Sequence, residues 1–261
     1  MIRPELPTDA AGLPPLPDAF EAALLPGLAS LGLRLDAVAR QAIDAHVRLL
    51  LAWNEAINLT SITDPATVAT RHVLDSLAAL PLLTGEPAAP RAALGLRLAD
   101  IGSGGGFPGL TLAAALPGSR VTLIESIAKK ARFLQVAAAA MGLADRATVR
   151  AARAEAVAAR DPAAWDIVTA RAVASLDDIV ELAMPLLRVG GRLLAWKGPD
   201  IEAEVAAAGR AAGALGGSAP VVHEVVGVAP LAGHRMVVVR KLAATAPGYP
   251  RDPARRKRLP W

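Results

Sequence analysis

The stretch LADIGSGGGFPGL at residues 98–110 decides the fold. It begins as an apolar strand, breaks at a cluster of glycines and continues as the start of a helix, which is the context of a nucleotide-binding turn. Gly102, Gly104 and Gly106 have no side chain where a ligand would approach the backbone, and the first amides of the helix are available to bind it. The turn predicts a nucleotide-type cofactor, with a purely structural glycine turn as the alternative.

From residue 96 onward, short apolar runs alternate with helical stretches. The expected strands lie at 96–101, 120–125, 147–150, 165–170 and 191–197, and the expected helices run to 116, to about 141, through a short segment, over 176–187 and from about 201. Such alternation is typical of a parallel sheet with helices on both faces. Two final runs, 219–228 and 234–241, have no helix between them and predict an antiparallel hairpin at the sheet edge. The fold class is therefore α/β with a mostly parallel sheet.

The residues before this sheet are predicted to be helical. Apolar residues recur at helical spacing over 35–51, and a second helical stretch covers about 65–83, before a linker rich in proline, glycine and alanine. Five prolines within residues 1–17 favour a disordered arm. We expect four parts, namely the arm at 1–17, a helical cap at 18–90, a cofactor-binding domain at 91–242 and a basic tail at 243–261.

The composition excludes several classes of protein. The chain has no cysteine, so disulfides, thiolate metal sites and thiol nucleophiles are excluded, and we expect no metal site. No charge-free apolar run reaches the roughly 20 residues of a membrane span, and the N-terminal residues contain no apolar signal core. We expect a soluble, cytoplasmic monomer. Lys and Arg exceed Asp and Glu only by 28 to 24, but the excess is concentrated in the last dozen residues, which favours a polyanionic partner.

Two cofactors fit the glycine turn. The spacing GxGxxG at residues 104–109, with Glu125 at the end of the next strand to hold a ribose, also occurs in NAD-binding folds. Asp100, two residues before Gly102, would repel a pyrophosphate but suits a cationic sulfonium ligand. Glu155, after the third strand, lies where an adenine amino group is often bound, and an ordinary carboxylate in a first helical turn is the alternative. S-adenosylmethionine is favoured, with an NAD-dependent oxidoreductase as the second hypothesis.

The residues also limit the methyl acceptor. Methyl transfer to carbon 5 of a pyrimidine normally needs a cysteine, which the chain lacks. Exocyclic amino groups are usually methylated beside an Asn/Asp-Pro-Pro-aromatic motif after the fourth strand, but DIVTARAVASL stands there at residues 166–176. A ring nitrogen such as guanine N7 has a lone pair and no proton to lose, so it needs no general base. The lack of evident catalytic residues fits that acceptor.

Several stretches from Trp53 onward carry a family resemblance. They are WNEAINLTSITDPATVATRHVLDSLA, ADIGSGGGFPG, TLIESIAKKARFL, DIVTARAVASL, LLAWKG, HRMVVVRK and the basic tail after YPR. Together they resemble the RsmG (GidB) family, bacterial methyltransferases of guanine N7 in 16S ribosomal RNA. The first stretch is the most diagnostic, because it lies outside the cofactor fold. The resemblance implies a Rossmann-like class I methyltransferase sheet, S-adenosylmethionine as cofactor, and 16S ribosomal RNA or a small-subunit assembly intermediate as partner.

The resemblance also implies site residues. The family's cofactor contacts fall on Gly102, Phe107, Ala154, Glu155 and Arg171. The general chemistry of the fold adds Asp100, Gly104 and Glu125. No catalytic residue is assigned, but Arg171 and Lys197 are candidates, because they follow strands whose carboxyl ends bind ligands in open parallel sheets. A capping or surface role for Arg171 and a solvent-facing position for Lys197 are the alternatives.

RNA contacts are expected at two places. Arg71 and His72 belong to the first matching stretch, where they either contact RNA or fix the helical cap against the sheet by hydrogen bonds. The tail concentrates positive charge suited to phosphate neutralisation, in Arg255, Arg256, Lys257 and Arg258. A solvated, disordered terminus is the alternative there. A third hypothesis for the whole chain is an RNA-binding module that keeps a cofactor pocket without turnover.

Overall fold

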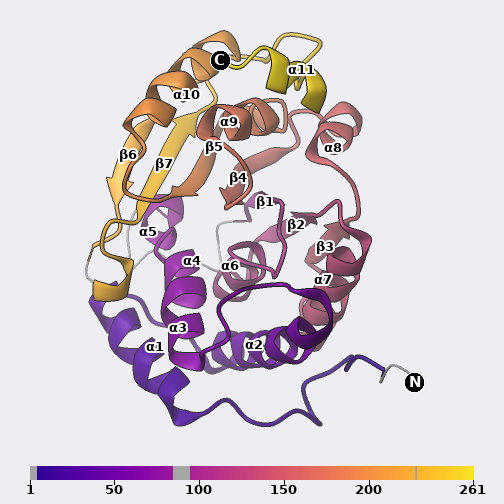
Figure 1. Ribbon diagram of the computed structural model, residues 1–261, viewed down its shortest axis with the longest axis vertical. Helices are drawn as coiled ribbons and strands as arrows, with labels where there is room; N and C mark the ends of the chain where they lie inside the picture. The colour runs from indigo at the N-terminus through magenta and orange to yellow at the C-terminus, as the bar shows by residue number, and fades with distance from the viewer. Residues whose placement is uncertain (1–4, 85–94, 227) are drawn as a thin grey trace.

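The computed structural model describes residues 5–84, 95–226 and 228–261. Its first elements are helices (Figure 1). They are α1 (Asp18–Ser30), α2 (Ala37–Ile57), α3 (Pro65–Val68), a π-helical segment (Ala69–Leu74), α4 (Asp75–Leu77) and α5 (Leu80–Thr84). Most of the predicted linker, and the predicted boundary between residues 90 and 91, lie outside the described residues.

A sheet of seven strands forms the centre of the described chain. Its strands are β1 (Arg97–Ile101), β2 (Arg120–Ile124), β3 (Ala147–Arg150), β4 (Trp165–Arg171), β5 (Leu187–Lys197), β6 (Val221–Glu224) and β7 (Arg235–Arg240). The order across the sheet is β3-β2-β1-β4-β5-β7-β6. The first five strands are parallel, whereas β7 is antiparallel to both β5 and β6. The predicted mostly parallel sheet with a C-terminal antiparallel pair is confirmed.

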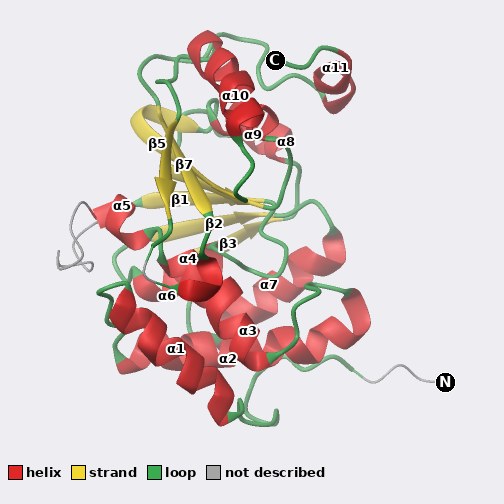
Figure 2. Cartoon of the chain, turned by 60° about the vertical axis from the view of Figure 1, so that its left-hand side comes forward, coloured by secondary structure: helices red, strands yellow, loops and turns green. Residues whose placement is uncertain are grey.

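Helices cover both faces of the sheet (Figure 2). Those that follow the strands are α6 (Gly109–Ala115), α7 (Ala128–Ala140), α8 (Ala154–Arg160), α9 (Leu176–Ala183), α10 (Glu202–Ala214) and α11 (Pro253–Arg258), with a 3₁₀ turn at Ala229–Leu231. The N-terminal helices pack with α6 and α7 on one face, and α8, α9 and α10 lie on the other. The strand order reverses between β1 and β4, and open parallel sheets bind ligands at such a point.

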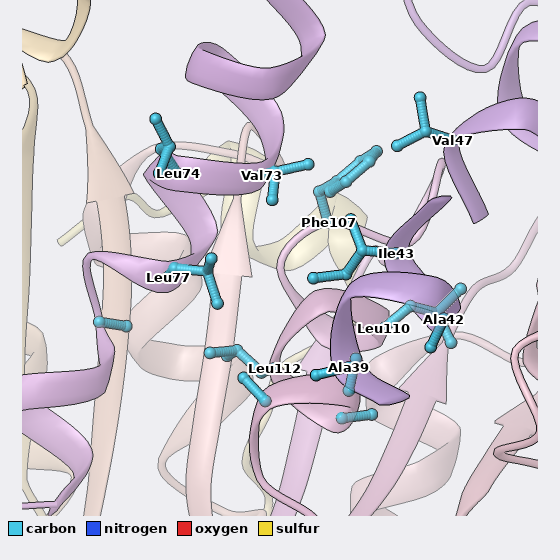
Figure 3. Packing of buried hydrophobic residues seen from close by; sticks show 14 of the residues in the cluster. Ala39, Ala42, Ile43, Val47, Val73, Leu74, Leu77, Phe107, Leu110 and Leu112 are labelled. Carbon is cyan, nitrogen blue, oxygen red and sulfur yellow. The ribbon is translucent and has the colours of Figure 1, made fainter. Parts of the chain in front are cut away.

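The N-terminal helices share their hydrophobic core with one face of the sheet. Helix α2 buries Ile43, Leu50 and Trp53 on one side, as its spacing of apolar residues predicts. Figure 3 shows Ile43 and Val47 of α2 near the ring of Phe107, which belongs to the glycine turn. All of these residues lie in one buried cluster with residues of α6 and α7. The N-terminal helices therefore rest directly on the turn.

Local hydrogen bonds set the limits of α2, which continues beyond the predicted end at residue 51. The carboxylate of Asp36 accepts a hydrogen bond of 2.7 Å from the Ala39 amide at the helix start. Asn58 ends the helix in the left-handed conformation, with φ of 50°. The side-chain oxygen of Asn54 accepts from the Leu59 amide over 2.6 Å. These bonds turn the chain out of α2 toward α3.

Residues 5–17 differ from the disordered arm predicted at 1–17, of which residues 1–4 lie outside the described residues. The indole Nε1 of Trp53 donates to the Pro7 carbonyl over 2.7 Å, and Arg48 Nε donates to the Pro14 carbonyl over 2.8 Å. Leu13 packs partly buried against the core. Proline has no amide hydrogen, so a proline-rich segment leaves carbonyls available to side-chain donors. Two donors of α2 use them and hold the segment in place.

The helix expected over 176–187 is shorter in the structure. Helix α9 ends at Ala183, and β5 begins at Leu187 instead of residue 191. Leu182 and Ala183 at the end of α9 and Leu186 and Leu187 at the start of β5 are all apolar and buried, so hydropathy alone does not show where the helix stops and the strand begins. The tail contains α11, which Asp252 caps by accepting from the Arg255 amide over 2.9 Å. No helix within the described ranges is long and apolar enough to cross a membrane.

We expect Gly109→Ala to destabilise the protein. A Cβ at this first residue of α6 would lie 2.4 Å from Leu123 Cδ2 and 2.7 Å from Asp100 Oδ2, and overpacking a core costs about 1–3 kcal/mol. Gly213→Ala in α10 is the matched control, because a Cβ there would have no atom within 4 Å beyond its chain neighbours and the nearby backbone of its own helix, among the described residues. Urea unfolding should show a lower midpoint for Gly109→Ala alone, and equal midpoints would contradict this packing.

Candidate active site

The glycine turn follows β1 and is held by residues at the end of β2. Gly102 and Gly104 have φ values of 66° and 52°, a left-handed conformation that glycine adopts without strain. The amide of Gly102 donates to the Ile124 carbonyl over 2.8 Å. Glu125 accepts from the Gly104 amide over 3.0 Å and from the Ile127 amide over 2.8 Å. One carboxylate oxygen of Glu125 therefore holds the glycine turn, and the other holds the start of α7.

Asp100 lies in β1 with its side chain fully inside the protein. Its Oδ1 accepts from the Thr169 hydroxyl over 2.8 Å, and its Oδ2 accepts from the Gly109 amide over 3.3 Å. Burial raises the pKa of Asp100 to about 6, although these hydrogen bonds act in the opposite direction. The carboxyl group ties β1 to β4 and α6. It supports the turn from inside the protein, where the sequence led us to expect a direct or water-mediated contact with a cationic ligand.

A cleft of about 220 Å³ opens beside Gly102. Its lining includes Gly102, Ala154, Glu155, Val173 and Arg256. The first four of these residues follow β1, β3 and β4, so the cleft lies at the carboxyl ends of parallel strands, where such sheets bind ligands. The structure thus brings together three of the residues predicted to bind the cofactor, Gly102, Ala154 and Glu155.

The lining has the chemistry of a site for an adenosine-type ligand. Ile101, Ile124 and Leu182 supply apolar surface suited to a flat base. Val173 lies directly over the turn, so that a Cβ on Gly102 would lie 2.8 Å from its Cγ2. Only glycine keeps this part of the cleft open at the backbone.

Glu155 supplies a hydrogen-bond acceptor in the cleft. Its Oε1 accepts from Arg256 Nη2 over 2.7 Å. Within the described ranges, its Oε2 forms no hydrogen bond. One oxygen is therefore held by the protein, and the other is available to a donor on a ligand.

Phe107 and Arg171 contact each other instead of lining this cleft. The Arg171 Cζ lies 5.6 Å from the centroid of the Phe107 ring. That ring also lies 4.7 Å from the ring of His72 and 4.6 Å from the ring of His46, measured between centroids. His46 Nε2 donates to the Gly105 carbonyl over 2.7 Å. The turn is thus held between α2 and the π-helical segment.

Asp75 joins Arg171 to the rest of the sheet. Its side chain is almost completely buried, and its Oδ2 accepts from Arg171 Nη1 over 2.9 Å. Its Oδ1 accepts from His234 Nδ1 over 2.9 Å, and its backbone carbonyl accepts from Trp196 Nε1 over 2.9 Å. Arg171 is therefore fixed at the end of β4 by a buried ion pair, and neither a helix cap nor a surface position describes it.

His72 is a neutral hydrogen-bond bridge. Its Nδ1 lies 3.1 Å from Arg171 Nη2, and a guanidinium only donates, so Nδ1 accepts. Its Nε2 then carries the hydrogen and donates to the Thr60 hydroxyl over 2.8 Å. Burial and the positive charge of Arg171 lower the pKa of His72 to about 4. Both ring nitrogens are used inside the protein, which favours the structural interpretation of His72 over an RNA contact.

Lys197 does not project into an open site. Its ammonium donates to Glu204 Oε2 over 2.6 Å and to the Ala174 carbonyl over 2.8 Å. The same glutamate accepts from the Leu176 amide over 2.8 Å. Lys197 therefore joins the end of β5 to the starts of α9 and α10. Two of its three N–H donors are engaged inside the protein, which favours a structural role for Lys197, and its candidacy as a catalytic residue stays a prediction.

The basic residues of the tail divide into two groups. Arg255, Lys257 and Arg258 are exposed, and so is Arg71 in the π-helical segment. Arg256 is 9% exposed and lies between Glu155 and Asp178. Its predicted contact with RNA is therefore corrected, because its guanidinium is engaged by carboxylates of the protein.

Sequence reasoning gave one residue of the site another role and missed a second one. Arg256 was assigned to RNA but lines the cleft, because its partner Glu155 lies 101 residues away and no local pattern pairs them. Glu181 is fully buried in α9 and accepts hydrogen bonds from Arg251 and Trp261. An acidic residue on the apolar side of a helix was the available signal for Glu181, since such a residue needs a partner.

Known proteins are similar to this chain in fold or in sequence. The O-methyltransferase from Bacillus cereus, solved in complex with SAH, has a similar fold, with a TM-score of 0.52 and 19% identity, over 75% of this chain and 90% of that chain. The ribosomal RNA small subunit methyltransferase G of Roseiflexus castenholzii is 46% identical over 230 residues, 85% of this chain and 92% of its own. That of Symbiobacterium thermophilum is 41% identical over 242 residues, 89% of this chain and 94% of its own.

The fold, the cleft and these similarities define an α/β methyltransferase. The family model described as GidB, rRNA small subunit methyltransferase G, matches residues 39–229. The chain belongs to this family, and the resemblance inferred from the sequence is confirmed.

We expect His72→Gln to reduce the pH dependence of stability. The pKa of His72 is about 4 in the folded protein against an ordinary 6.5, so between these values the unfolded chain binds a proton here that the folded chain does not. The neutral ring therefore contributes fully to the free energy of unfolding above pH 6.5. This contribution falls by up to about 1.4 kcal/mol per pH unit as the pH decreases toward 4. Urea unfolding across this range should show a smaller decline in the variant. Parallel curves would contradict a neutral His72.

Proposed function

We propose that this protein transfers a methyl group from S-adenosylmethionine to N7 of a guanine in 16S ribosomal RNA, in the cytoplasm where the small subunit is assembled. The observation that carries the proposal is the cleft beside Gly102, with its available acceptor on Glu155, in a chain of the rRNA small subunit methyltransferase G family. The assignment of guanine N7 as the methyl acceptor rests on the resemblance to the family and on the absence of a cysteine nucleophile.

The cleft would hold the adenosine part of the cofactor. Glu155 Oε2 would accept a hydrogen bond from the adenine amino group, and the backbone at Gly102 and Ala154 would lie against the ligand. Glu125 and Gly104 act together, because their hydrogen bond fixes the turn that the ligand contacts. Asp100 acts from inside the protein by holding β1 against β4, as its bond to Thr169 shows.

Arg171 and Phe107 would bind the amino acid part of the cofactor. In the described chain, Arg171 uses Nη1 for the Arg71 carbonyl and Asp75, and one Nη2 hydrogen for His72. Its Nε and the second Nη2 hydrogen form a fork that suits a carboxylate. Phe107 supports this fork as a cation–π partner. The buried ion pair with Asp75 keeps the guanidinium in the orientation that the ligand needs.

The chemistry asks little of the protein beyond position. The cofactor supplies a methyl group activated on a sulfonium. Guanine N7 has no proton to lose, so the residues around it need only orient the base and exclude water. The neutral His72, with both ring nitrogens bonded inside the protein, fits a reaction without a general base.

The RNA would lie across the exposed basic residues. Arg255, Lys257 and Arg258 on α11 offer positive charge for backbone phosphates, and Arg71 adds to it near the turn. Contacts of this kind position a nucleic acid without reading its sequence.

An NAD-dependent oxidoreductase is not favoured. The GxGxxG spacing at residues 104–109 would place a pyrophosphate at the start of α6. The Gly109 amide there donates to the carboxylate of Asp100, so a negative charge of the protein already occupies the position that a phosphate would need.

Labelled methyl transfer tests the proposal. The protein is incubated with labelled S-adenosylmethionine and, separately, with unmodified 16S ribosomal RNA, small subunits and assembly intermediates. Label should enter the RNA at a site that aniline cleaves after reduction. Transfer only to protein or small molecules would overturn the proposal, and cofactor binding without transfer to any RNA would favour the non-catalytic RNA-binding module.

We expect Gly102→Ala to weaken S-adenosylhomocysteine binding by about tenfold or more. The new Cβ would clash with Val173 in the wall of the cleft and would strain a residue with φ of 66°. Gly142→Ala is the matched control, since Gly142 has φ of 69° but a Cβ there would have no described atom within 4 Å beyond its chain neighbours. Calorimetry should show weaker binding only for Gly102→Ala, and an equal loss in both variants would trace the effect to general strain.

A further inference from the structure

The C-terminal segment, residues 249–261, lies against the side of the cleft formed by α8 and α9. Figure 1 shows α11 next to these two helices. Two ion pairs, Arg251 with Glu181 and Arg256 with Glu155, connect the segment to them. Arg256 is itself part of the lining of the cleft. The segment therefore contributes a residue to the site and does not merely extend from the fold.

Glu181 anchors this segment. Its carboxylate accepts from the Arg251 amide over 2.7 Å, from Arg251 Nη2 over 2.6 Å and from Trp261 Nε1 over 2.6 Å. The Arg251 Cζ also lies 4.6 Å from the centroid of the Trp261 ring. Charge-assisted hydrogen bonds of this kind are strong and directional. They hold the segment at Arg251 and Trp261 and do not involve Arg256.

Arg256 is held on several sides. Its Nη2 donates to Glu155 Oε1 over 2.7 Å, and its Nη1 donates to the Arg251 carbonyl over 2.6 Å. Its Nε lies 3.2 Å from Asp178 Oδ1. Only 9% of this side chain is exposed. Since Glu181 and Arg251 already anchor the segment, this second ion pair serves the carboxylate in the cleft.

The bond from Arg256 restricts the carboxylate of Glu155. A glutamate side chain has three rotatable bonds and loses entropy when it is fixed. The Glu155 side chain is 19% exposed, so without Arg256 its carboxylate would be able to turn toward water. With Arg256 in place, Oε1 is fixed and Oε2 is directed by the same bond.

We propose that Arg256 is a positioning residue of the cofactor site, which acts through Glu155 to hold an acceptor for the amino group of the adenine ring. This inference rests on the proposed use of S-adenosylmethionine. It assigns to the C-terminal segment a part in selecting the cofactor, in addition to any contact of its exposed residues with RNA.

The test is a double-mutant cycle measured by calorimetry with S-adenosylhomocysteine. Arg256→Ala should weaken binding by about tenfold. In a Glu155→Gln background the same change should have little further effect, because the group that Arg256 positions is no longer a carboxylate. Arg160→Ala is the control, since Arg160 is an exposed arginine in the last turn of α8.

A second ligand separates positioning from a general structural role. S-inosylhomocysteine carries a carbonyl oxygen on carbon 6 in place of the adenine amino group and gives Glu155 no amino donor. The unaltered protein should prefer S-adenosylhomocysteine, and Arg256→Ala should reduce this preference. An equal loss of affinity for both ligands in Arg256→Ala would show that Arg256 only maintains the fold of the cleft.

Thermal unfolding without ligand shows whether each variant is folded. Should Arg256→Ala be unfolded, Arg256→Lys replaces it, because it keeps a charge near Asp178 but gives up the fork that spans Glu155 and the Arg251 carbonyl. An unchanged affinity in a folded Arg256 variant, or losses that add in the double variant, would overturn the inference alone. Failure of the unaltered protein to bind S-adenosylhomocysteine would instead overturn the proposed function.

Discussion

The buried carboxylate of Asp75 is the interaction on which the arrangement of the site depends. It accepts hydrogen bonds from Arg171 and His234, which lie 96 and 159 residues away along the chain. A buried ion pair that loses one partner leaves an uncompensated charge and costs about 3–5 kcal/mol. The N-terminal helices, β4 and the turn before β7 are therefore coupled at one point. Arg171 owes its orientation beside Phe107 to this coupling, and the glycine turn gains its support from the N-terminal helices through the same contacts.

The sheet could be predicted because each strand is recognisable from a few consecutive residues of the sequence. Parallel strands covered on both faces appear as short apolar runs, and the absence of a helix between the last two runs identified the antiparallel pair. Prediction failed where one type of sequence suits two structures. The apolar residues around Leu187 fit a helix or a strand, and they became the start of β5. The prolines before residue 18 carried no sign that Trp53 and Arg48 would bind their carbonyls.

The site was predictable only in part, for a similar reason. Glycines that follow a strand point to a ligand at the backbone, and the position of Glu155 followed from the family resemblance. Neither the glycine pattern nor the family resemblance predicted which residue each charged side chain would pair with. Lys197 meets Glu204 because β5 and α10 are neighbours in space, and Arg256 meets Glu155 because the tail folds back across α8. Charged residues close in sequence, such as Arg255 and Arg256, consequently have different environments.

The docking of α11 has a consequence for how positive charge is presented. A helix of six residues is too short to be stable alone in water, so its order derives from the Glu181 anchor and the cap at Asp252. A flexible basic tail loses conformational entropy each time it binds a polyanion. In this protein the conformational entropy of the tail is lost during folding. The exposed positive charges therefore have a fixed spacing before a nucleic acid binds. Rigid display of this kind favours partners of matching shape over polyanions in general.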